Sequence, residues 1–420
     1  MLIEFSVANC LSFDERQTLS MVKSHSDELP NNAYSVEKAK DLHLLHSVAI
    51  YGANASGKSN FIKAFHLMEQ IVTTTSQRGD ELDVKPFKLN QKNITAPSEF
   101  EVVFVIDGVR YQYGFSADKY QIYDEWLYAY PKNRPQKWFE RVWVNDEKRH
   151  TWQFSSLFLG NKRLWQESTR DNALFLSTAV QLNSEQLKPL FDWFDKTLAF
   201  IGVDGLSPSY TAQLCTKEQK NEIIRLLRTA DFNIHDIKVQ IEDFDESKLP
   251  DDMPSELKNH LVKALKGTKQ IDSIELLHYD DLGNPVYFDF DEESDGTQKF
   301  FAFSGPILDI LMNGRILFID ELNQNLHPKL VQFLVDLFHN PKSNPRHAQL
   351  IFTTHETSIL NQNVFRRDQI WFCERNKQQS SILYPLSDFS PKKGKENLEN
   401  VYLSGGYGAV PFIDHFILEQ

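Results

Sequence analysis

Apolar and polar residues alternate near the start of the chain, which predicts short strands there. The predicted strands are Leu2–Val7 and Arg16–Met21, and the polar residues 22–42 are expected to form a loop. An apolar run with β-branched residues follows at Ser47–Tyr51. The period then becomes helical, with one apolar face formed by Phe61, Phe65, Met68 and Val72. The pattern therefore predicts a buried strand followed at once by an amphipathic helix.

Residues 99–154 have a period of two, which predicts an antiparallel sheet. Apolar and polar positions alternate around Tyr113, and Asp107-Gly108 is a strong signal for a hairpin turn. A second hairpin is expected around Asn145–Arg149.

Residues 155–265 have mostly helical patterns. One expected helix face is formed by Ile223, Leu226, Leu227 and Ala230. The acidic stretch Asp243–Ser255 contains two prolines and is a candidate flexible connection. Strands are expected again at Ile274–His278 and Val286–Phe290, joined by a turn at Asp281–Asn284.

Three strongly apolar runs, separated by helical patterns, mark the final part: Arg315–Ile319, Gln349–Thr353 and Gln369–Cys373. Apolar strands that alternate with helices indicate a parallel sheet covered on both faces. The expected fold class is α/β, a mixed sheet with flanking helices plus an antiparallel β lobe and a helical insertion. The expected parts are an N-terminal lobe, a mainly helical insertion and a C-terminal lobe, at residues 1–154, 155–265 and 266–420.

Composition narrows the class of protein. The chain has 420 residues, 41% of them hydrophobic, which allows two or three domains with sizeable cores and excludes general disorder. A net charge of −13 disfavours indiscriminate binding to nucleic acid but does not exclude a local basic groove. The basic stretches Arg134–Lys137 and Lys392–Lys395 are interpreted as solvated loops rather than DNA contacts.

Cysteine spacing and hydropathy indicate a cytoplasmic protein. Cys10, Cys215 and Cys373 lie far apart and form no CxxC pair, so neither a zinc ribbon nor a disulfide scaffold is expected. No apolar run approaches the ~20 residues of a membrane span. The first residues lack the basic segment of a signal peptide.

Candidate chemistry begins directly after Ser47–Tyr51, where the sequence GANASGKS matches GxxxxGK[ST]. In such a P-loop, backbone N–H groups curl around phosphate oxygens, and the helix that follows adds the positive end of its dipole. Lys58 is predicted to reach the β- and γ-phosphates of ATP, and Ser59 to bind Mg²⁺. A glycine-rich turn without a ligand is the less favoured alternative. The predicted nucleotide-binding residues here are Gly52, Ala53, Asn54, Ala55, Ser56, Gly57, Lys58, Ser59 and Asn60.

Two carboxylates, Asp320 and Glu321, end the apolar run at Arg315–Ile319. Ionised acids at the end of a buried strand are costly unless a cation compensates them. With a P-loop in the same chain, Asp320 is predicted to hold Mg²⁺ and Glu321 to activate the attacking water. A pair of solvent-facing acids is the alternative.

His355 follows the next apolar run, Gln349–Thr353. A histidine at this strand end is predicted to contact the γ-phosphate and sense its presence. A purely structural histidine is the alternative, and the order P-loop, acidic pair and histidine favours the functional role.

In this order the motifs resemble the ABC-class ATPases, in particular their SMC- and RecF-like branch. Ser294, Asp295 and Gly296 look like the signature motif of that class, which meets the P-loop of a second subunit. The resemblance implies ATP and Mg²⁺ as cofactors and Lys58, Glu321 and His355 as catalytic residues. It also implies a homodimer closed by the nucleotides, with a higher oligomer as a further option.

Finer details are similar to the ATPases of bacterial anti-phage and abortive-infection systems, relatives of the ATPase part of OLD proteins and of Septu- and retron-associated ATPases. The segments that carry this likeness are Phe5–Phe13, Glu321–Pro328 and Tyr402–Pro411. No OLD-type Toprim nuclease is expected to follow. The chain departs from the family pattern at Asn323, where Asp is common, and at Gly406, where Arg is common.

The resemblance implies an ATP-hydrolysing switch that controls a separate effector, a nuclease or toxin. Two alternatives stay open: a repair or chromosome-maintenance ATPase that binds DNA directly, and an ATP-binding scaffold without productive turnover. A transporter subunit is least favoured. Gln91 is the one candidate for the Q-loop glutamine, and residues 155–265 and Tyr402–Pro411 are candidate partner surfaces.

Overall fold

The computed structural model describes all residues except 38, 75, 76, 78, 132, 133, 204, 245, 247–252, 254–261, 263–268, 393, 395 and 412–420. The chain forms two compact units. The first unit comprises Met1–Val203, Ile310–Gln324 and Val331–Gln420, and the second comprises Asp204–Asp309 and Asn325–Leu330. The three parts expected from the sequence, 1–154, 155–265 and 266–420, stay a prediction about how the chain is organised.

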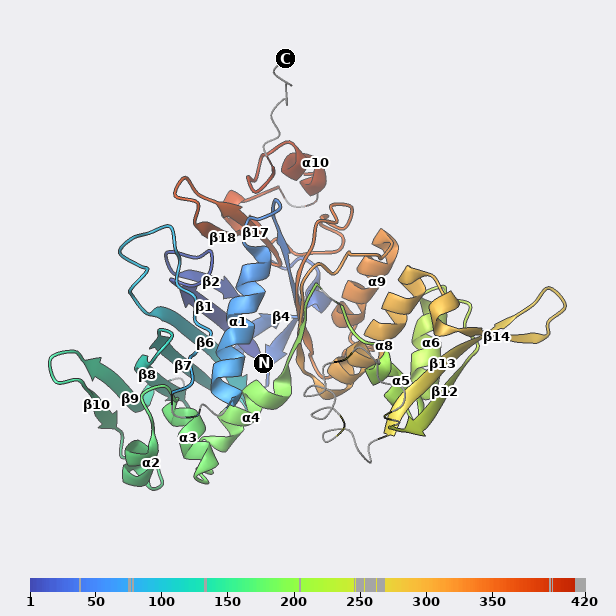
Figure 1. The fold of residues 1–420 in the computed structure, drawn as a ribbon. Helices are drawn as coiled ribbons and strands as arrows, with labels where there is room; N and C mark the ends of the chain where they lie inside the picture. Colours follow the sequence, from blue (N-terminus) through green and yellow to red (C-terminus); the bar gives the residue numbers. More distant parts are fainter. Residues whose placement is uncertain are drawn as a thin grey trace, which may run out of the picture. The chain divides into compact units, whose positions relative to one another are not determined.

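A seven-stranded antiparallel sheet forms one layer of the first unit, with the order β10-β9-β8-β7-β6-β1-β2. The predicted antiparallel sheet is therefore confirmed, and the two N-terminal strands extend it (Figure 1). Its strands are β1 (Leu2–Ala8), β2 (Gln17–Ser20), β6 (Ser98–Ile106), β7 (Val109–Ala117), β8 (Ile122–Tyr130), β9 (Gln136–Val144) and β10 (Arg149–Phe154).

A six-stranded sheet carries the motifs, with the order β11-β15-β16-β5-β17-β18. All neighbours are parallel except the edge pair β17 and β18, so the α/β class with a mixed sheet is confirmed. Every residue of β5, β15 and β16 is buried, as their apolar sequences predict. The strands are β5 (Ser47–Tyr51), β11 (Leu198–Ile201), β15 (Ile316–Ile319), β16 (Gln349–Thr353), β17 (Ile370–Arg375) and β18 (Ser381–Pro385).

Helix α1 joins the two sheets of the first unit. Phe65 stacks on Phe5 of β1, with ring centroids 4.2 Å apart, and meets Phe318 of β15 edge-on at 4.9 Å. The apolar face predicted from the sequence is the face that makes these contacts. Helices in the first unit are α1 (Lys58–Thr73), α2 (Lys162–Ser168), α3 (Phe175–Gln181), α4 (Lys188–Thr197), most of α9 (Pro328–His339), α10 (Leu398–Leu403), and the 3₁₀ turns Pro30–Asn32 and Leu386–Phe389.

Three strands of the first unit, β3 (Ala33–Val36), β4 (Ala39–Leu45) and β11, differ from the sequence expectation. The expected loop 22–42 contains β3, which pairs with β4 as a two-stranded sheet. The expected helical stretch 155–265 contains β11, which pairs with β15. Strands β3 and β11 have four residues each. They are stabilised by pairing, β3 with β4 and β11 with the distant β15, so the local sequence pattern does not predict them.

The second unit packs helices on a small sheet. Strands β12 (Asp236–Asp243), β13 (Lys269–Tyr279) and β14 (Pro285–Asp289) are antiparallel, and they confirm the strands and turn expected at 274–290. Its other elements are α5 (Ser209–Cys215), α6 (Lys220–Thr229), the 3₁₀ turn Phe290–Glu292 and most of α8 (Asp295–Asn313). The buried face of α6 carries Ile223, Leu226 and Leu227, as predicted. The connection expected at Asp243–Ser255 lies mostly outside the described residues.

Candidate functional site

The P-loop connects the buried strand β5 to α1, at the centre of the six-stranded sheet. Two of its glycines are required by their surroundings. A Cβ on Gly52 would lie 2.2 Å from the Cys373 carbonyl oxygen, and one on Gly57 would lie 2.0 Å from Ser381 Oγ. Gly57 also has a φ of 112°, in the left-handed region that favours glycine. The loop is therefore held tightly against β17 and β18.

Lys58 is folded back onto the loop. Its Nζ donates hydrogen bonds to the carbonyl oxygens of Gly52, at 2.8 Å, and Ala53, at 3.0 Å. Burial lowers the pKa of the ammonium, although the nearby Asp320 and Glu321 carboxylates oppose that shift. The Lys58 ammonium is thus already placed beside the loop. A charged phosphate oxygen would stabilise this cation more strongly than the two carbonyl oxygens do.

Asp320 is buried at the end of β15 and accepts two hydroxyl hydrogen bonds on one oxygen. Ser59 Oγ donates to Asp320 Oδ1 at 3.0 Å, and Thr353 Oγ1 donates to the same atom at 2.6 Å. The carboxyl ends of the parallel strands β15 and β16 thus meet the start of α1. The structure brings together the two residues predicted to hold Mg²⁺, Ser59 and Asp320.

Glu321 has an unusual backbone conformation, with a φ of 56°. A non-glycine residue there costs roughly 1–3 kcal/mol and is often retained at functional sites. Its backbone N–H donates to Thr353 Oγ1 at 2.8 Å, which fixes this turn. Thr353 therefore contacts both acids, a role that sequence reasoning missed because the residue looked like an ordinary β-branched strand residue.

Asn323, noted as a departure from the family pattern, holds the segment that carries His355. Its side-chain oxygen accepts hydrogen bonds from Thr354 Oγ1 at 3.0 Å and from the backbone N–H of His355 at 3.1 Å. An amide oxygen accepts both bonds, so an aspartate is not needed for this contact. Burial, and then the Lys58 charge, lower the pKa of His355, which favours a neutral imidazole.

Lys58, Ser59, Glu321 and His355 line one cavity of about 470 Å³. Most of the predicted P-loop residues line it together with Glu321 and His355. Gly52 and Ala53 do not line it, but their carbonyl oxygens accept hydrogen bonds from Lys58. Arg375, at the end of β17, also lines it, and nothing in the sequence pattern marked that residue. The lining residues are Asn54, Ala55, Ser56, Gly57, Lys58, Ser59, Asn60, Glu321, His355 and Arg375.

The candidate signature residues lie in the second unit, at the start of α8. Ser294 Oγ accepts a hydrogen bond from the backbone N–H of Thr297 at 3.2 Å, as an N-cap residue does. Asp295 and Gly296 occupy the first two positions of the helix. The roles of all three residues stay a prediction.

The C-terminal segment Tyr402–Pro411 packs on β17. The rings of Tyr402 and Tyr407 stack on Phe372 with centroids 5.4 and 5.6 Å apart. At Gly406 a Cβ would lie 2.5 Å from Val401 Cγ1, so an arginine there would need the turn to shift. The departure at Gly406 therefore has a steric reason. Gln91 is exposed and does not line the P-loop cavity.

The residues present fit both implied cofactors. The buried atom Ser56 Oγ has no hydrogen-bond partner, and Lys58 is paired only with carbonyls, as expected where phosphate oxygens would bind. Ser59 and Asp320 offer oxygen ligands, which Mg²⁺ prefers, and phosphate oxygens and water complete such a site. Within the described part of the chain, no cluster of three or more His, Cys, Asp or Glu side chains could hold a metal by itself.

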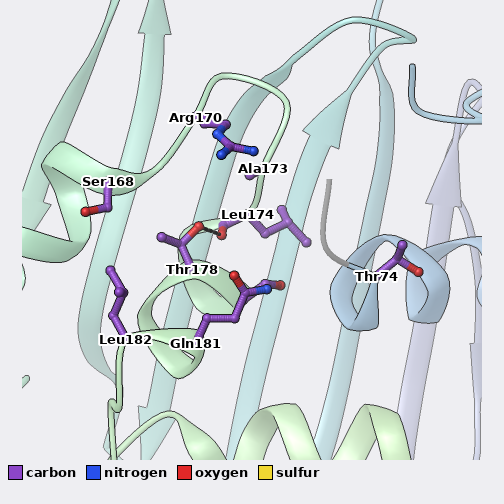
Figure 2. A pocket seen from close by; sticks show the side chains of 9 residues that line it. Thr74, Ser168, Arg170, Ala173, Leu174, Thr178, Gln181 and Leu182 are labelled. Carbon is purple, nitrogen blue, oxygen red and sulfur yellow. Dashed lines mark hydrogen bonds between the residues drawn. The ribbon is translucent and has the colours of Figure 1, made fainter. Parts of the chain in front are cut away.

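A smaller cavity lies elsewhere in the first unit. Figure 2 shows this hollow of about 160 Å³ beside α3 and the end of α1. Its hydroxyls are used locally: Ser177 Oγ donates to the Val72 carbonyl at 2.6 Å, and Thr178 Oγ1 to the Leu174 carbonyl at 2.9 Å. None of the predicted site residues lines it. Helices in the described parts of the chain include none long and apolar enough to cross a membrane.

One family model matches most of the chain. Residues 47–361 match the family model described as "AAA domain, putative AbiEii toxin, Type IV TA system". The match includes the P-loop, the acidic pair and His355. No curated protein matches the chain.

Three solved structures are similar at low identity. An SMC head bound to the C-winged helix domain of ScpA is 11% identical, with a TM-score of 0.42, and the match covers 91% of this chain and 97% of that one. The SMC head domain from Thermotoga maritima is 12% identical, with a TM-score of 0.39 and coverage of 91% and 98%. CbiO1 from Clostridium perfringens, part of the ABC transporter complex CbiONQ, is 12% identical, with a TM-score of 0.29 and coverage of 97% and 98%. At TM-scores below 0.5 these likenesses carry no weight for function.

Proposed function

The chain belongs to this AAA-domain family of P-loop ATPases, and on that premise we propose that it hydrolyses ATP to ADP and phosphate at the cavity between the P-loop, Glu321 and His355. One observation carries the proposal. Ser59 Oγ and Thr353 Oγ1 converge on the same oxygen of Asp320, so the helix start and two strand ends are set to hold one cation beside the P-loop.

The chain's own groups have separate tasks in this proposal. The P-loop amides and Lys58 bind and orient the phosphate chain, and Ser59 and Asp320 hold Mg²⁺. Bound there, Mg²⁺ would neutralise charge that develops on the phosphate oxygens. The conformation of Glu321 is fixed by Thr353, which leaves its carboxylate to line the cavity.

Glu321 accepts the proton of the attacking water in this proposal. A carboxylate is a suitable general base when it stands within one hydrogen bond of that water. His355, kept neutral by burial and by the Lys58 charge, can donate one N–H to a γ-phosphate oxygen. The backbone of His355 is hydrogen-bonded to Asn323, which follows Glu321 by two residues. Loss of the γ-phosphate contact at His355 would therefore be transmitted to the turn that carries Asp320 and Glu321.

The test is Glu321→Gln, which keeps the size and polarity of the side chain but cannot take up the proton. Phosphate release should fall by about 10²–10⁴-fold while ATP binding persists. Glu147→Gln, on an exposed hairpin turn, is the matched control and should keep wild-type turnover. Hydrolysis at the wild-type rate by Glu321→Gln would exclude Glu321 as the base.

The hydrolytic site is further proposed to drive a switch. Two copies would close over ATP, with the P-loop of one facing Ser294–Gly296 of the other, and hydrolysis would loosen the pair. The position of Ser294 supports this, because it lies at the start of the 19-residue α8, where the positive end of the helix dipole favours an anion such as a phosphate. We further propose a defence role in which the nucleotide state controls a separate nuclease or toxin. The family description, which names a putative toxin of a type IV toxin–antitoxin system, supports the defence role and does not name an effector.

A further inference from the structure

Strand β17 contributes Arg375 to the lining of the P-loop cavity, and both β17 and β18 contact the loop directly. Cys373 Sγ donates to the Ser56 carbonyl oxygen at 3.3 Å, and Ser381 Oγ donates to the same oxygen at 2.6 Å. Arg375 pairs with Ser381 across the two strands and follows Cys373 by two positions. Cross-strand partners and residues two apart share a face of a sheet, so Arg375 is on the face that contacts the loop.

Arg375 is available to bind an anion. It is exposed, and its contact at Nη1 is a long one of 3.5 Å to Gln379 Oε1. Among the described residues no carboxylate forms an ion pair with it. Lys58, the other cation lining this cavity, is instead turned onto the carbonyls of its own loop.

A second cavity, of about 340 Å³, is also lined by Arg375. It shares Asn60 and Arg375 with the P-loop cavity, and Leu11, Pro86 and Leu89 give it an apolar part. Glu321 and His355 line only the P-loop cavity. Arg375 therefore belongs to the lining that both cavities share, whereas Glu321 and His355 belong to the P-loop cavity alone.

We infer that Arg375 is a nucleotide-binding residue, contributed by the same copy as the P-loop, that contacts the α- and β-phosphates from the lining that the two cavities share. The inference rests on the proposed function, because it requires a nucleotide in the P-loop cavity. A guanidinium forms two parallel hydrogen bonds with phosphate oxygens, whereas an ammonium offers a point charge. Arg375 then contributes to the binding of ATP and ADP alike and takes no part in activating water.

The test is a calorimetric titration of the full chain, in the presence of Mg²⁺, with either AMP-PNP or ADP. Arg375→Ala should raise both Kd values by about tenfold, which is the loss of affinity expected when a hydrogen bond to a charged group is removed. Arg375→Lys should recover part of the affinity because it keeps the charge. Arg149→Ala removes an exposed strand arginine outside both cavities and should leave both Kd values unchanged.

Circular dichroism establishes that each variant is folded, and Arg375→Gln replaces Arg375→Ala if the latter does not fold. Unchanged affinities in the folded variant would overturn the inference and leave the proposed hydrolysis standing. A loss confined to AMP-PNP would also overturn it, because Arg375 would then contact only the γ-phosphate. A wild-type chain that binds neither nucleotide would overturn the proposed function together with this inference.

Discussion

Thr353 connects the two candidate acids through a single hydroxyl. Its oxygen donates to Asp320 and accepts from the backbone N–H of Glu321. A strand residue thereby sets both the metal-side carboxylate and the turn that carries the proposed base. Thr353 is buried and does not line the P-loop cavity, so it acts on the site by positioning the two acids.

Thr353→Val removes both hydrogen bonds with little change in volume. We expect ATP hydrolysis to fall by about 10- to 100-fold, since losing hydrogen bonds to a charged and a backbone group costs ~1.5–3 kcal/mol. The Mg²⁺ concentration needed for half-maximal activity should rise as well. Thr353→Ser keeps the hydroxyl and should restore most activity. Equal activity and Mg²⁺ dependence in the valine variant would show that the hydroxyl does not organise the acids.

Lys58→Ala tests the assignment of the P-loop. Removing the charge should lower ATP hydrolysis by roughly 10²-fold or more, as deletion of a preorganised electrostatic contact does. The circular dichroism spectrum should stay that of the wild type, because the partners of Lys58 belong to its own loop. Lys63→Ala, on an exposed position of α1, is the matched control. Wild-type turnover by a folded Lys58→Ala chain would contradict the assignment.

At the scale of elements, a buried ion pair joins the seven-stranded sheet to α3. Glu125 and Arg141 are fully buried, and Arg141 Nε lies 3.0 Å from Glu125 Oε2. Glu125 also accepts the backbone N–H groups of Phe175 and Leu176, and Arg141 donates to the Ala173 carbonyl at 2.6 Å. The pair therefore fixes the start of α3 to the sheet.

Arg141→Met should be strongly destabilising because it leaves the Glu125 charge buried and unpaired. The expected loss of unfolding free energy is about 3–5 kcal/mol, measured by urea denaturation. The double variant Glu125→Gln, Arg141→Met should be less destabilised than Arg141→Met alone, since the unpaired charge is gone. A single variant as stable as the wild type would refute this account of the pair.

Histidines near the six-stranded sheet make the stability of the fold depend on pH. Burial lowers the pKa of His46 to about 4 and that of His339 to about 3. His339 Nε2 lies 2.8 Å from Ser47 Oγ, at the start of β5. Below pH ~6.5 the unfolded chain takes up protons that these folded histidines do not. The stabilisation of the folded state by these neutral histidines is fully present above that pH. It is lost progressively as the pH falls toward 4 and below.

The urea midpoint should therefore fall as the pH is lowered from 7.5 to 4.5. His339→Asn should flatten this dependence, whatever its effect on stability at neutral pH. His25→Asn, at an exposed position, should leave the slope unchanged. If the slope is the same in all three chains, His339 does not titrate differently in the folded state.

At the scale of the whole molecule, the proposed switch requires two copies. A mixture of Lys58→Ala and Ser294→Arg chains should regain up to one working site per heterodimer, because each copy supplies what the other lacks. Light scattering should show an ATP-dependent dimer of Glu321→Gln, in which bound ATP persists. Failure to regain activity, despite demonstrated exchange of subunits, would argue against a site shared between copies.

The same scale includes the proposed effector. Products of neighbouring genes should bind the Glu321→Gln chain in ATP and release it in ADP, as followed by affinity pull-down. The packing of Tyr402 and Tyr407 on Phe372 makes residues 155–265 the better candidate for the contact surface. ATP-dependent cleavage of DNA or RNA by the purified chain alone would contradict a separate effector.

The sequence by itself determined the P-loop, the acidic pair, His355 and the strands that carry them. These features are local: a buried strand has a continuous apolar run, and the chemistry follows within a few residues of its end. Strands β5 and β16 have the predicted bounds, and β15 begins one residue later than predicted.

Only the tertiary structure decided what joins those segments. Thr353 contacts Asp320 across 33 positions of the chain, and β11 pairs with β15 although more than 100 residues separate them. Arg375 reaches the P-loop cavity because β17 lies beside β5 in the sheet. No periodic pattern encodes such neighbours, since strand order depends on packing between distant segments.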